Sequence, residues 1–330
     1  MERASSKKAY STTRTATATT TTCSTSRTGS LWRDISVICP PPPPYVCPRY
    51  FSDDWLNGAA GMGDAYKFVY LGPRGTVTPL HADVLNSYSW SSNVCGRKLW
   101  YLVPPEFTHL LYDAFGTRLA PHLHSDLDYS GDLGPALYPG LAGARRRAYR
   151  VVQETGETVF VPSGWHHTVE NLAPTLSINH NWINGTNIAW SWDRVRSELS
   201  HVAESVIMHP HAPIVETFER EQNDVAEALK GDDLLLLWLV VSKKVGMILD
   251  GSEKAGNGRR DINGIGTNTD KGEDTEVGGP CFDLRSALKV LESLCALLSS
   301  YGKDGLIEKS FELADVYHLV FRIQDYLTVK

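Results

Sequence analysis

The chain has 330 residues, a formal net charge of −6 and a sequence pI near 6.0. Hydrophobic residues make up 42% of it and charged residues 21%, which is ordinary for a globular protein and excludes a wholly disordered chain. The acidic balance argues against direct nucleic-acid binding, because that binding is driven by basic surface. The longest apolar run, Leu234–Val241, is far shorter than the roughly 20 residues that span a bilayer, so we expect no membrane protein.

The N-terminal residues are rich in Ser, Thr and Ala, and the first thirty contain a single acid, Glu2. Such a segment buries too little apolar surface to fold alone, so residues 1–48, which include the proline run Pro40–Pro44, are predicted to be a disordered tail. An organelle transit peptide is the alternative, since those peptides are rich in Ser and Arg and poor in acids. The six cysteines include no CxxC pair, which is typical of a reducing compartment. We therefore expect a cytoplasmic protein, with the nucleus as the alternative.

Residues 49–190 contain short runs of aromatic and β-branched residues, separated by turns such as Pro162-Ser163-Gly164. These runs predict an antiparallel β-sandwich or barrel. They cover residues 66–72, 76–84, 93–103, 148–153, 157–162, 167–172 and 175–183. A long connection, roughly 104–146, is expected to be an insertion over one edge of a sheet.

Apolar residues recur at three- and four-residue spacing after Asn187, so residues 191–330 are predicted to be a helical C-terminal region. The expected helices cover 188–207, 215–231, 232–249, about 283–300 and about 311–328. A Gly-, Asp- and Asn-rich stretch at about 250–280 predicts a flexible loop.

The sharpest chemical signal is His81-Ala82-Asp83. Residues two apart on a strand share a face, so an imidazole and a carboxylate would lie side by side. A second histidine on a neighbouring strand would complete the two-histidine, one-carboxylate set that holds non-haem Fe(II) and leaves positions open. The triplet alone is weak evidence, because most such triplets are surface residues or satisfied core polar groups.

Two other histidine groups invite a zinc interpretation: His122 and His124 with Asp126, and His209 with His211. A zinc site needs its ligands arranged around one centre, for which the sequence gives no further sign. We interpret both groups as surface or loop residues.

Several segments resemble, in the right order, the JmjC family of Fe(II)- and 2-oxoglutarate-dependent oxygenases over roughly residues 49–190. They are GPRGTVTPLHADV, SYSWSSNVCGRKLWYLVPP and ETGETVFVPSGWHHTVENLAPTLSINHNW. YFSDDWLN and SINHNWINGTN are most similar to the JmjC-domain-containing protein 4 subfamily of lysyl hydroxylases. The resemblance implies a mainly β fold, the double-stranded β-helix (jelly-roll or cupin-like), with Fe(II) as cofactor, 2-oxoglutarate as cosubstrate and O2 as oxidant.

Matched to the family's motifs, His81 and Asp83 are the first two iron ligands and His167 is the third. His166 is the rival for the third position, because adjacent residues on a strand face opposite sides. The family's ligand is the second residue after the tryptophan of GWxH, which is His167 here. His166 is then expected to pack or hydrogen-bond at the mouth of the site.

The resemblance also assigns Lys98 to the distal carboxylate of 2-oxoglutarate. A dianion inside a barrel needs a cation at its far end, and a lysine in an otherwise apolar strand is unusual unless it is paired.

Weaker matches concern the rest of the cosubstrate. Thr78 occupies the position of a hydroxyl that joins the lysine at the distal carboxylate, and Asn181 matches an asparagine at the cosubstrate's other end, with Asn179 as its competitor. Relatives often have an asparagine where Ser91 aligns, two positions before Asn93, so the contact from that strand stays open.

The subfamily resemblance implies a protein substrate hydroxylated on a lysine side chain, with the translation termination (release) factor as the target. The alternatives are demethylation of lysine or arginine, as on histone tails, and a catalytically inert JmjC scaffold. The scaffold alternative stays open because JmjC enzymes have further strands and helices before the segment that begins here near Tyr50. The oligomeric state does not follow from the sequence.

Overall fold

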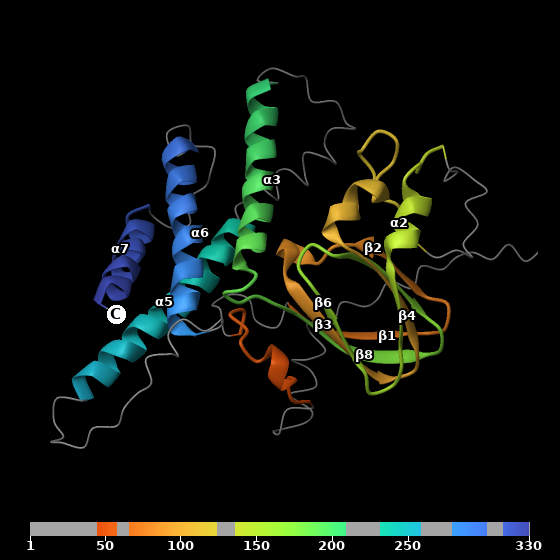
Figure 1. Cartoon of the computed structure of the whole chain (residues 1–330), viewed down its shortest axis with the longest axis horizontal. Coiled ribbons are helices and arrows are strands. Elements are labelled where there is room, and N and C mark those ends of the chain that lie inside the picture. The colour runs from red at the N-terminus through yellow and green to blue at the C-terminus, as the bar shows by residue number, and fades with distance from the viewer. Residues whose placement is uncertain are drawn as a thin grey trace, which may run out of the picture.

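The computed structural model describes residues 45–57, 66–123, 136–208, 232–258, 279–301 and 313–329. Figure 1 shows two facing β-sheets on one side of the molecule and long helices on the other. Residues 1–44 of the tail expected over 1–48, and the helix expected at 215–231, lie outside the described residues.

The two four-stranded sheets are antiparallel throughout. The first, called the β8 sheet, contains in spatial order β1 (Lys67–Gly72), β8 (Thr175–Trp182), β3 (Tyr88–Cys95) and β6 (Thr158–Val161). The second, called the β7 sheet, contains β2 (Val77–His81), β7 (His166–Asn171), β4 (Lys98–Val103) and β5 (Tyr149–Gln153). Most neighbouring strands in each sheet are distant in sequence. This strand order is that of the predicted double-stranded β-helix.

Strand pairing brings distant parts of the sequence together. In the β7 sheet His81 lies opposite His167, and in the β8 sheet Ser89 lies opposite Asn181. The register of β2 shifts between Thr78 and His81, around Pro79. Proline has no N–H to donate to a ladder, so it is tolerated at such an irregularity, which turns the following side chain to a new direction.

The single strand expected at 93–103 is wrong, because this run is a hairpin. β3 begins at Tyr88 and ends at Cys95, and β4 begins at Lys98. Gly96 makes the turn with a φ of +88°, and a Cβ at this position would lie 2.2 Å from the carbonyl oxygen of Pro174. Only glycine satisfies both conditions, so the chain reverses here.

The strand expected at 76–84 is too long. β2 ends at His81, and Asp83 precedes a short 3₁₀ helix, η2 (Val84–Asn86). Leu85 and Asn86 both have positive φ, 56° and 47°, which is strained for residues with a side chain. Leu85 is buried in the helical core, and this packing holds the turn in place. Asp83 therefore reaches its position from a turn and not from the strand.

The insertion at 104–146 covers the outer edge of β2. The Leu80 N–H donates to the carbonyl oxygen of Pro121 at 2.7 Å, so the edge strand is partly paired. The described part of the insertion contains η3 (Pro105–Leu111) and α2 (Leu141–Arg147), which lie together above the sheets in Figure 1. A small apolar core joins both to the sheet, and its members include Leu80, Val103, Leu111, Leu123 and Leu141.

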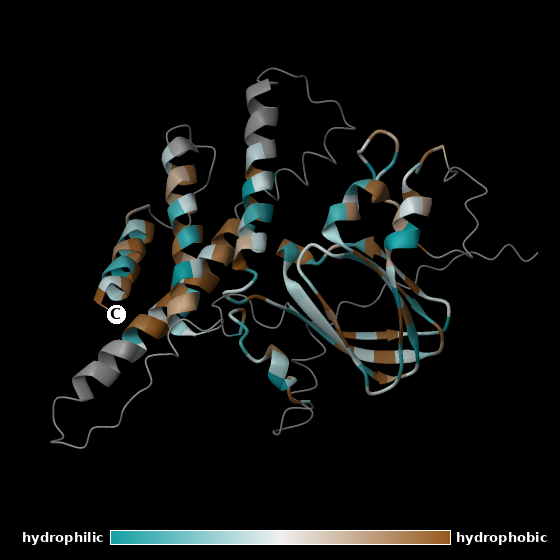
Figure 2. Ribbon diagram, viewed as in Figure 1, coloured by the Kyte–Doolittle hydropathy of each residue, from teal (hydrophilic) through white to brown (hydrophobic). Residues whose placement is uncertain are grey.

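The helical region contains α3 (Ile188–Met208), α5 (Asp232–Gly258), α6 (Pro280–Tyr301) and α7 (Leu313–Val329). Figure 2 shows hydrophobic and hydrophilic residues mixed along these helices, and their apolar faces form the largest core of the molecule. α5 ends at Gly258, so it includes the first residues of the stretch, about 250–280, that was expected to be a loop. No helix among the described residues is long and apolar enough to cross a membrane.

Residues 45–57, which include η1 (Arg49–Phe51), join the sheets to the helices. Tyr45 belongs to the stretch expected to be tail, yet its hydroxyl hydrogen-bonds the ring of His180 on β8. Phe51 stacks on Trp90 with ring centroids 5.7 Å apart. Trp55 belongs to the core between the helices. Residues 45–48, which were expected to be part of the tail, are therefore packed against the sheets and helices.

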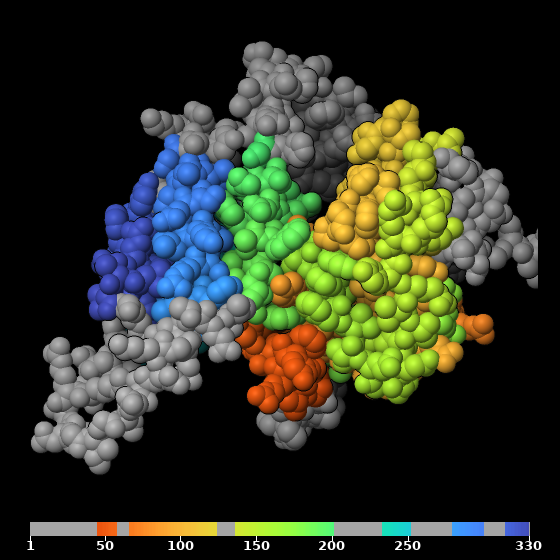
Figure 3. Space-filling model, in the orientation of Figure 1, coloured from red at the N-terminus to blue at the C-terminus, as the bar shows by residue number. Residues whose placement is uncertain are grey.

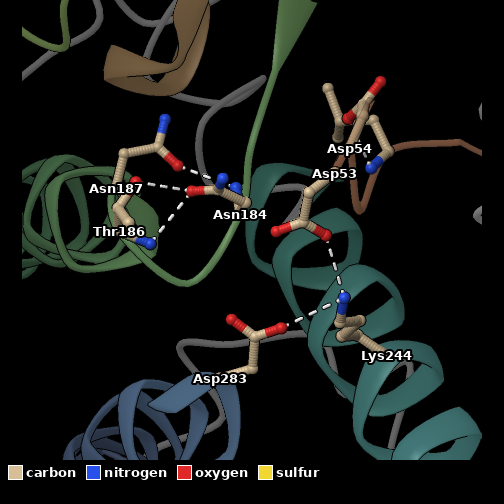
Figure 4. A network of polar contacts seen from close by, with 8 residues as sticks. Asp53, Asp54, Asn184, Thr186, Asn187, Lys244 and Asp283 are labelled. Atoms are coloured by element: carbon tan, nitrogen blue, oxygen red, sulfur yellow. Dashed lines mark hydrogen bonds and ion pairs between the residues drawn. The ribbon is translucent and has the colours of Figure 1, made fainter. Parts of the chain in front are cut away.

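An ion pair ties this segment to the C-terminal helices. The ammonium of Lys244 on α5 lies 3.0 Å from a carboxylate oxygen of Asp53 and 3.1 Å from one of Asp283 on α6 (Figure 4). Beside it, Asn184 and Asn187 hydrogen-bond each other at the start of α3. Asp283 is almost fully buried, so its charge depends on this ammonium.

Candidate metal centre and its chamber

His81, Asp83 and His167 form a metal-type cluster. One ligand atom from each residue lies within 4.8 Å of the others. The two imidazole centroids are 4.3 Å apart, as the cross-strand pairing of β2 and β7 requires. Among the described residues, this is the one group of three or more His, Cys, Asp or Glu side chains with that spacing.

Backbone carbonyls orient both histidines. Nδ1 of His81 lies 2.8 Å from the Pro79 carbonyl oxygen, and Nδ1 of His167 lies 3.1 Å from that of Trp165. A carbonyl oxygen only accepts, so each Nδ1 carries the proton and each Nε2 is left as the ligand nitrogen. Burial also lowers the pKa of His167, which keeps this imidazole neutral. In both histidines the Nε2 atom is therefore the one available to bind a metal.

The carboxylate of Asp83 is held from the opposite sheet. Its Oδ2 accepts a hydrogen bond from the Ser89 hydroxyl at 2.7 Å, and its Oδ1 accepts one from Asn181 Nδ2 at 3.2 Å. Two imidazoles and one carboxylate on one side of a cavity fit a non-haem Fe(II) ion. The donor set thus fits the metal that the sequence predicted.

A chamber between the sheets runs from this cluster to Lys98. Its lining includes Tyr70, Thr78, Asn179 and Asn181. Thr78 and Lys98, as expected, share one cavity with the three metal-type ligands. Asn179 and Asn181 both face it because they lie two residues apart on β8.

Lys98 is a buried cation at the end of the chamber. It is 5% exposed, and its Nζ donates to the Ser177 hydroxyl at 2.5 Å. In the described part of the chain no carboxylate forms an ion pair with it, and burial lowers its pKa to about 8. An unpaired buried ammonium is costly, so the chamber is built to receive an anion.

The contact from β3 to the cosubstrate site, which the sequence left undecided at Ser91, is indirect and runs through Asn179. The Ser91 hydroxyl donates to Asn179 Oδ1 at 3.2 Å, and Asn179 lines the chamber. Asn93 is not among the residues that line the chamber, and its Nδ2 donates to the Gly96 carbonyl oxygen at 2.8 Å in the hairpin turn.

Sequence reasoning missed Ser177, Ser89 and Tyr70. Ser177 contacts Lys98, Ser89 contacts Asp83, and the Tyr70 ring lies 6.0 Å from the Lys98 ammonium. A signal for Ser177 was present, because polar residues at 177, 179 and 181 alternate along one face of a strand inside the sandwich.

His166 faces a different space from His167. It lines a second, open cavity of about 750 Å³ between η2, η3 and α3, which also contacts His81 and Asp83. Figure 3 shows a hollow between the surface of α3 and that of η3. Burial lowers the pKa of His166, so this imidazole is neutral at the mouth of the cluster.

The two other histidine groups that invited a zinc interpretation form no metal-type cluster among the described residues. His122 is described and belongs to no such cluster among them. His124, Asp126, His209 and His211 lie outside the described part of the chain.

Residues 68–182, which contain the cluster and the chamber, match the family model described as "JmjC domain, hydroxylase". The chain belongs to the JmjC domain family. The match ends at Trp182, so the helical region from α3 onward lies outside it.

Three relatives illustrate the similarity. The chain is 36% identical over 260 residues to the 2-oxoglutarate and iron-dependent oxygenase JMJD4 of Gallus gallus, covering 76% of this chain and 57% of that protein. It is 47% identical over 167 residues to the JMJD4 of Homo sapiens, covering 49% and 38%. It is 40% identical over 180 residues to the arginine-specific demethylase JMJ20 of Arabidopsis thaliana, covering 49% and 37%. The chain therefore spans between 37% and 57% of the length of these relatives.

Proposed function

We propose that this chain is an Fe(II)- and 2-oxoglutarate-dependent oxygenase that hydroxylates a lysine side chain of a protein. One observation carries the proposal: a buried Lys98 ammonium, which forms no ion pair with any described residue, and a His-Asp-His cluster share one chamber. 2-Oxoglutarate has a keto acid at one end, which chelates a metal, and a carboxylate at the other. The chamber offers a complementary group at each end.

The chain's own residues bind and orient the reactants. His81, Asp83 and His167 would hold the iron, and Lys98 would neutralise the distal carboxylate. The Thr78 hydroxyl would donate a hydrogen bond to the same carboxylate. When bound, Fe(II) supplies the activation of O2 that is coupled to oxidative decarboxylation of the cosubstrate. The buried Trp100 ring, stacked on His167 with ring centroids 5.7 Å apart, would keep water away from this histidine.

The open cavity beside His166 supports a protein as the substrate. Its volume, about 750 Å³, suits a side chain that enters together with the backbone segment carrying it. Trp190 on its wall is 46% exposed, and exposed tryptophans are frequent anchors in protein interfaces.

The target we propose is a translation termination factor. The reaction consumes O2 and 2-oxoglutarate, places one oxygen atom in succinate and the other on a lysine carbon, and releases CO2. The relatives named 2-oxoglutarate and iron-dependent oxygenases support the reaction class.

A second candidate function is demethylation, which the name of the Arabidopsis relative favours. The same oxidation of an N-methyl group releases formaldehyde and leaves no oxygen on the protein. An inert scaffold is disfavoured, because the three metal-type ligands and Lys98 are all present and correctly grouped.

The test incubates the iron-loaded protein with 2-oxoglutarate, O2 and a translation termination factor, followed by mass spectrometry. We expect one added oxygen on a lysine, succinate in equal amount and no formaldehyde. Methylated histone peptides serve as the comparison substrate. Formaldehyde released in proportion to succinate would show that the chain is a demethylase and not a hydroxylase. A lack of any succinate would favour the inert scaffold.

A further inference from the structure

Asp83 differs from the two histidines in how it is held. His81 and His167 belong to the β7 sheet and are oriented by backbone carbonyls, which no substitution removes. Asp83 lies beyond the end of β2, in a turn, and its two carboxylate oxygens are bonded by side chains. The carboxylate is thus the ligand whose orientation depends on other residues' identities.

Two directly paired residues of the β8 sheet hold this carboxylate. Ser89 on β3 and Asn181 on β8 are cross-strand partners, so their side chains emerge together toward the β7 sheet. Ser89 donates to one oxygen at 2.7 Å and Asn181 to the other at 3.2 Å. The pair reaches across the chamber and fixes Asp83 from the far side.

The hydrogen-bond inventory of Asn181 limits what else it does. Its amide nitrogen has two hydrogens, and it donates to Asp83 Oδ1 at 3.2 Å and to the Ser87 hydroxyl at 2.9 Å. A carboxylate only accepts, so the nitrogen of the amide must face Asp83. The remaining group is a carbonyl oxygen, which cannot hydrogen-bond a carboxylate of 2-oxoglutarate.

We infer that Ser89 and Asn181 are positioning residues for the metal ligand Asp83, and that Asn181 does not bind the cosubstrate. This differs from the cosubstrate contact that the family resemblance implied for Asn181. The inference rests on the proposed iron centre and is independent of the protein substrate. Partners of this kind typically change metal affinity by about 10- to 100-fold when removed.

The test is a calorimetric titration with Mn(II), which replaces Fe(II) and does not oxidise, in the absence of 2-oxoglutarate. We expect Ser89→Ala and Asn181→Ala each to bind Mn(II) about tenfold more weakly or worse, and Ser89→Thr, which keeps the hydroxyl, to recover most of the loss. 2-Oxoglutarate is then titrated at saturating Mn(II), where Asn181→Ala should bind it as the wild type does.

A matched control comes from the same strand as Ser89. Ser92→Ala removes a hydroxyl on β3 that contacts Thr158 at 2.6 Å outside the chamber. This control should retain wild-type Mn(II) affinity. The thermal midpoint of each metal-free variant shows whether a lost affinity reflects lost folding, and Ser89→Ala, a smaller change, serves if Asn181→Ala is unfolded.

Unchanged Mn(II) affinity in folded Ser89→Ala and Asn181→Ala would overturn the inference. Unchanged Mn(II) affinity with weaker 2-oxoglutarate binding in Asn181→Ala would do so as well, and would restore the cosubstrate contact. A wild-type protein that binds no Mn(II) would overturn the proposed metal centre itself, and this inference with it.

Discussion

The two ends of the chamber are prepared for their ligands in opposite ways. At the metal end, backbone carbonyls and the side chains of Ser89 and Asn181 satisfy the ligands and leave them correctly oriented. At the other end, Lys98 is buried with only the Ser177 hydroxyl as a polar partner among the described residues. At the metal end the ligands are already oriented and hydrogen-bonded. At the lysine end a buried ammonium without an anion raises the free energy of the protein, and binding of an anion lowers it again. Binding of the cosubstrate should therefore depend more on charge, and binding of the metal more on geometry.

The largest expected effect comes from removing a metal ligand. His167→Ala should abolish binding of Mn(II) or Fe(II) and all succinate formation, because two ligands do not hold the ion in an open site. His166→Ala is the matched control, since its ring faces the open cavity, and it should keep metal binding. Metal content after dialysis measures both. A metal-free His166→Ala beside a metal-loaded His167→Ala would reverse the assignment of the third ligand.

The next effect concerns the charge at the other end. In Lys98→Ala the distal carboxylate of 2-oxoglutarate would be buried without a cation, which typically costs about 3–5 kcal/mol, or several hundredfold or more in affinity. Metal binding should survive. Arg97→Ala, which removes an exposed cation paired with Glu154 in the same hairpin, should leave the cosubstrate affinity unchanged. Equal 2-oxoglutarate affinity in Lys98→Ala and wild type would remove this lysine from the site.

The same charge predicts a pH dependence. Burial lowers the pKa of Lys98 to about 8, so before the cosubstrate binds the ammonium is present below this pH and is lost above it. The affinity for 2-oxoglutarate should therefore fall as the pH rises past 8, and binding at this pH should take up protons, because the dianion restores the charged form. Calorimetry in buffers of different ionisation enthalpy measures the uptake. Lys98→Ala should show no such pH dependence. A wild-type affinity for 2-oxoglutarate that stays constant from pH 7 to 9.5 would contradict a role for the Lys98 ammonium in binding it.

The smallest effect tests the hydroxyl beside the lysine. Thr78→Val keeps the shape and removes one neutral hydrogen bond, worth about 0.5–1.5 kcal/mol, so 2-oxoglutarate should bind about two- to tenfold more weakly. Metal affinity should not change, because Thr78 lines the chamber and is not one of the three metal-type ligands. An unchanged cosubstrate affinity would leave the distal carboxylate to Lys98 alone.

Much of this architecture follows from the sequence. The short aromatic and β-branched runs predicted the strands, because strand propensity depends on local residue types. The resemblance to the JmjC family assigned the ligands within the HxD and GWHH segments. The hairpin at Gly96 was missed, since its reason is a carbonyl oxygen of Pro174 that comes close only in the folded chain. The turn carrying Asp83 was missed for a similar reason, because Leu85 is held there by the distant helical core.

The partners of the ligands were harder to predict than the ligands. Ser89 and Asn181 are 92 positions apart in sequence, and only the pairing of β3 with β8 reveals that they meet. The role of Asn181 depends on which of its amide atoms faces Asp83, and strand periodicity contains no such information. Ion pairs such as Lys244 with Asp53 and Asp283 likewise depend on how the helices dock on residues 45–57.

The most direct test of the two-ended chamber is an anaerobic titration of the Fe(II)-loaded protein with 2-oxoglutarate, followed by visible absorption. Chelation of Fe(II) by the keto acid produces a charge-transfer band that reports metal and cosubstrate together. The account predicts that the band saturates at one equivalent in the wild type, is absent in His167→Ala and needs several hundredfold more 2-oxoglutarate in Lys98→Ala. Iron-loaded wild-type protein that gives no band at saturating 2-oxoglutarate would contradict it.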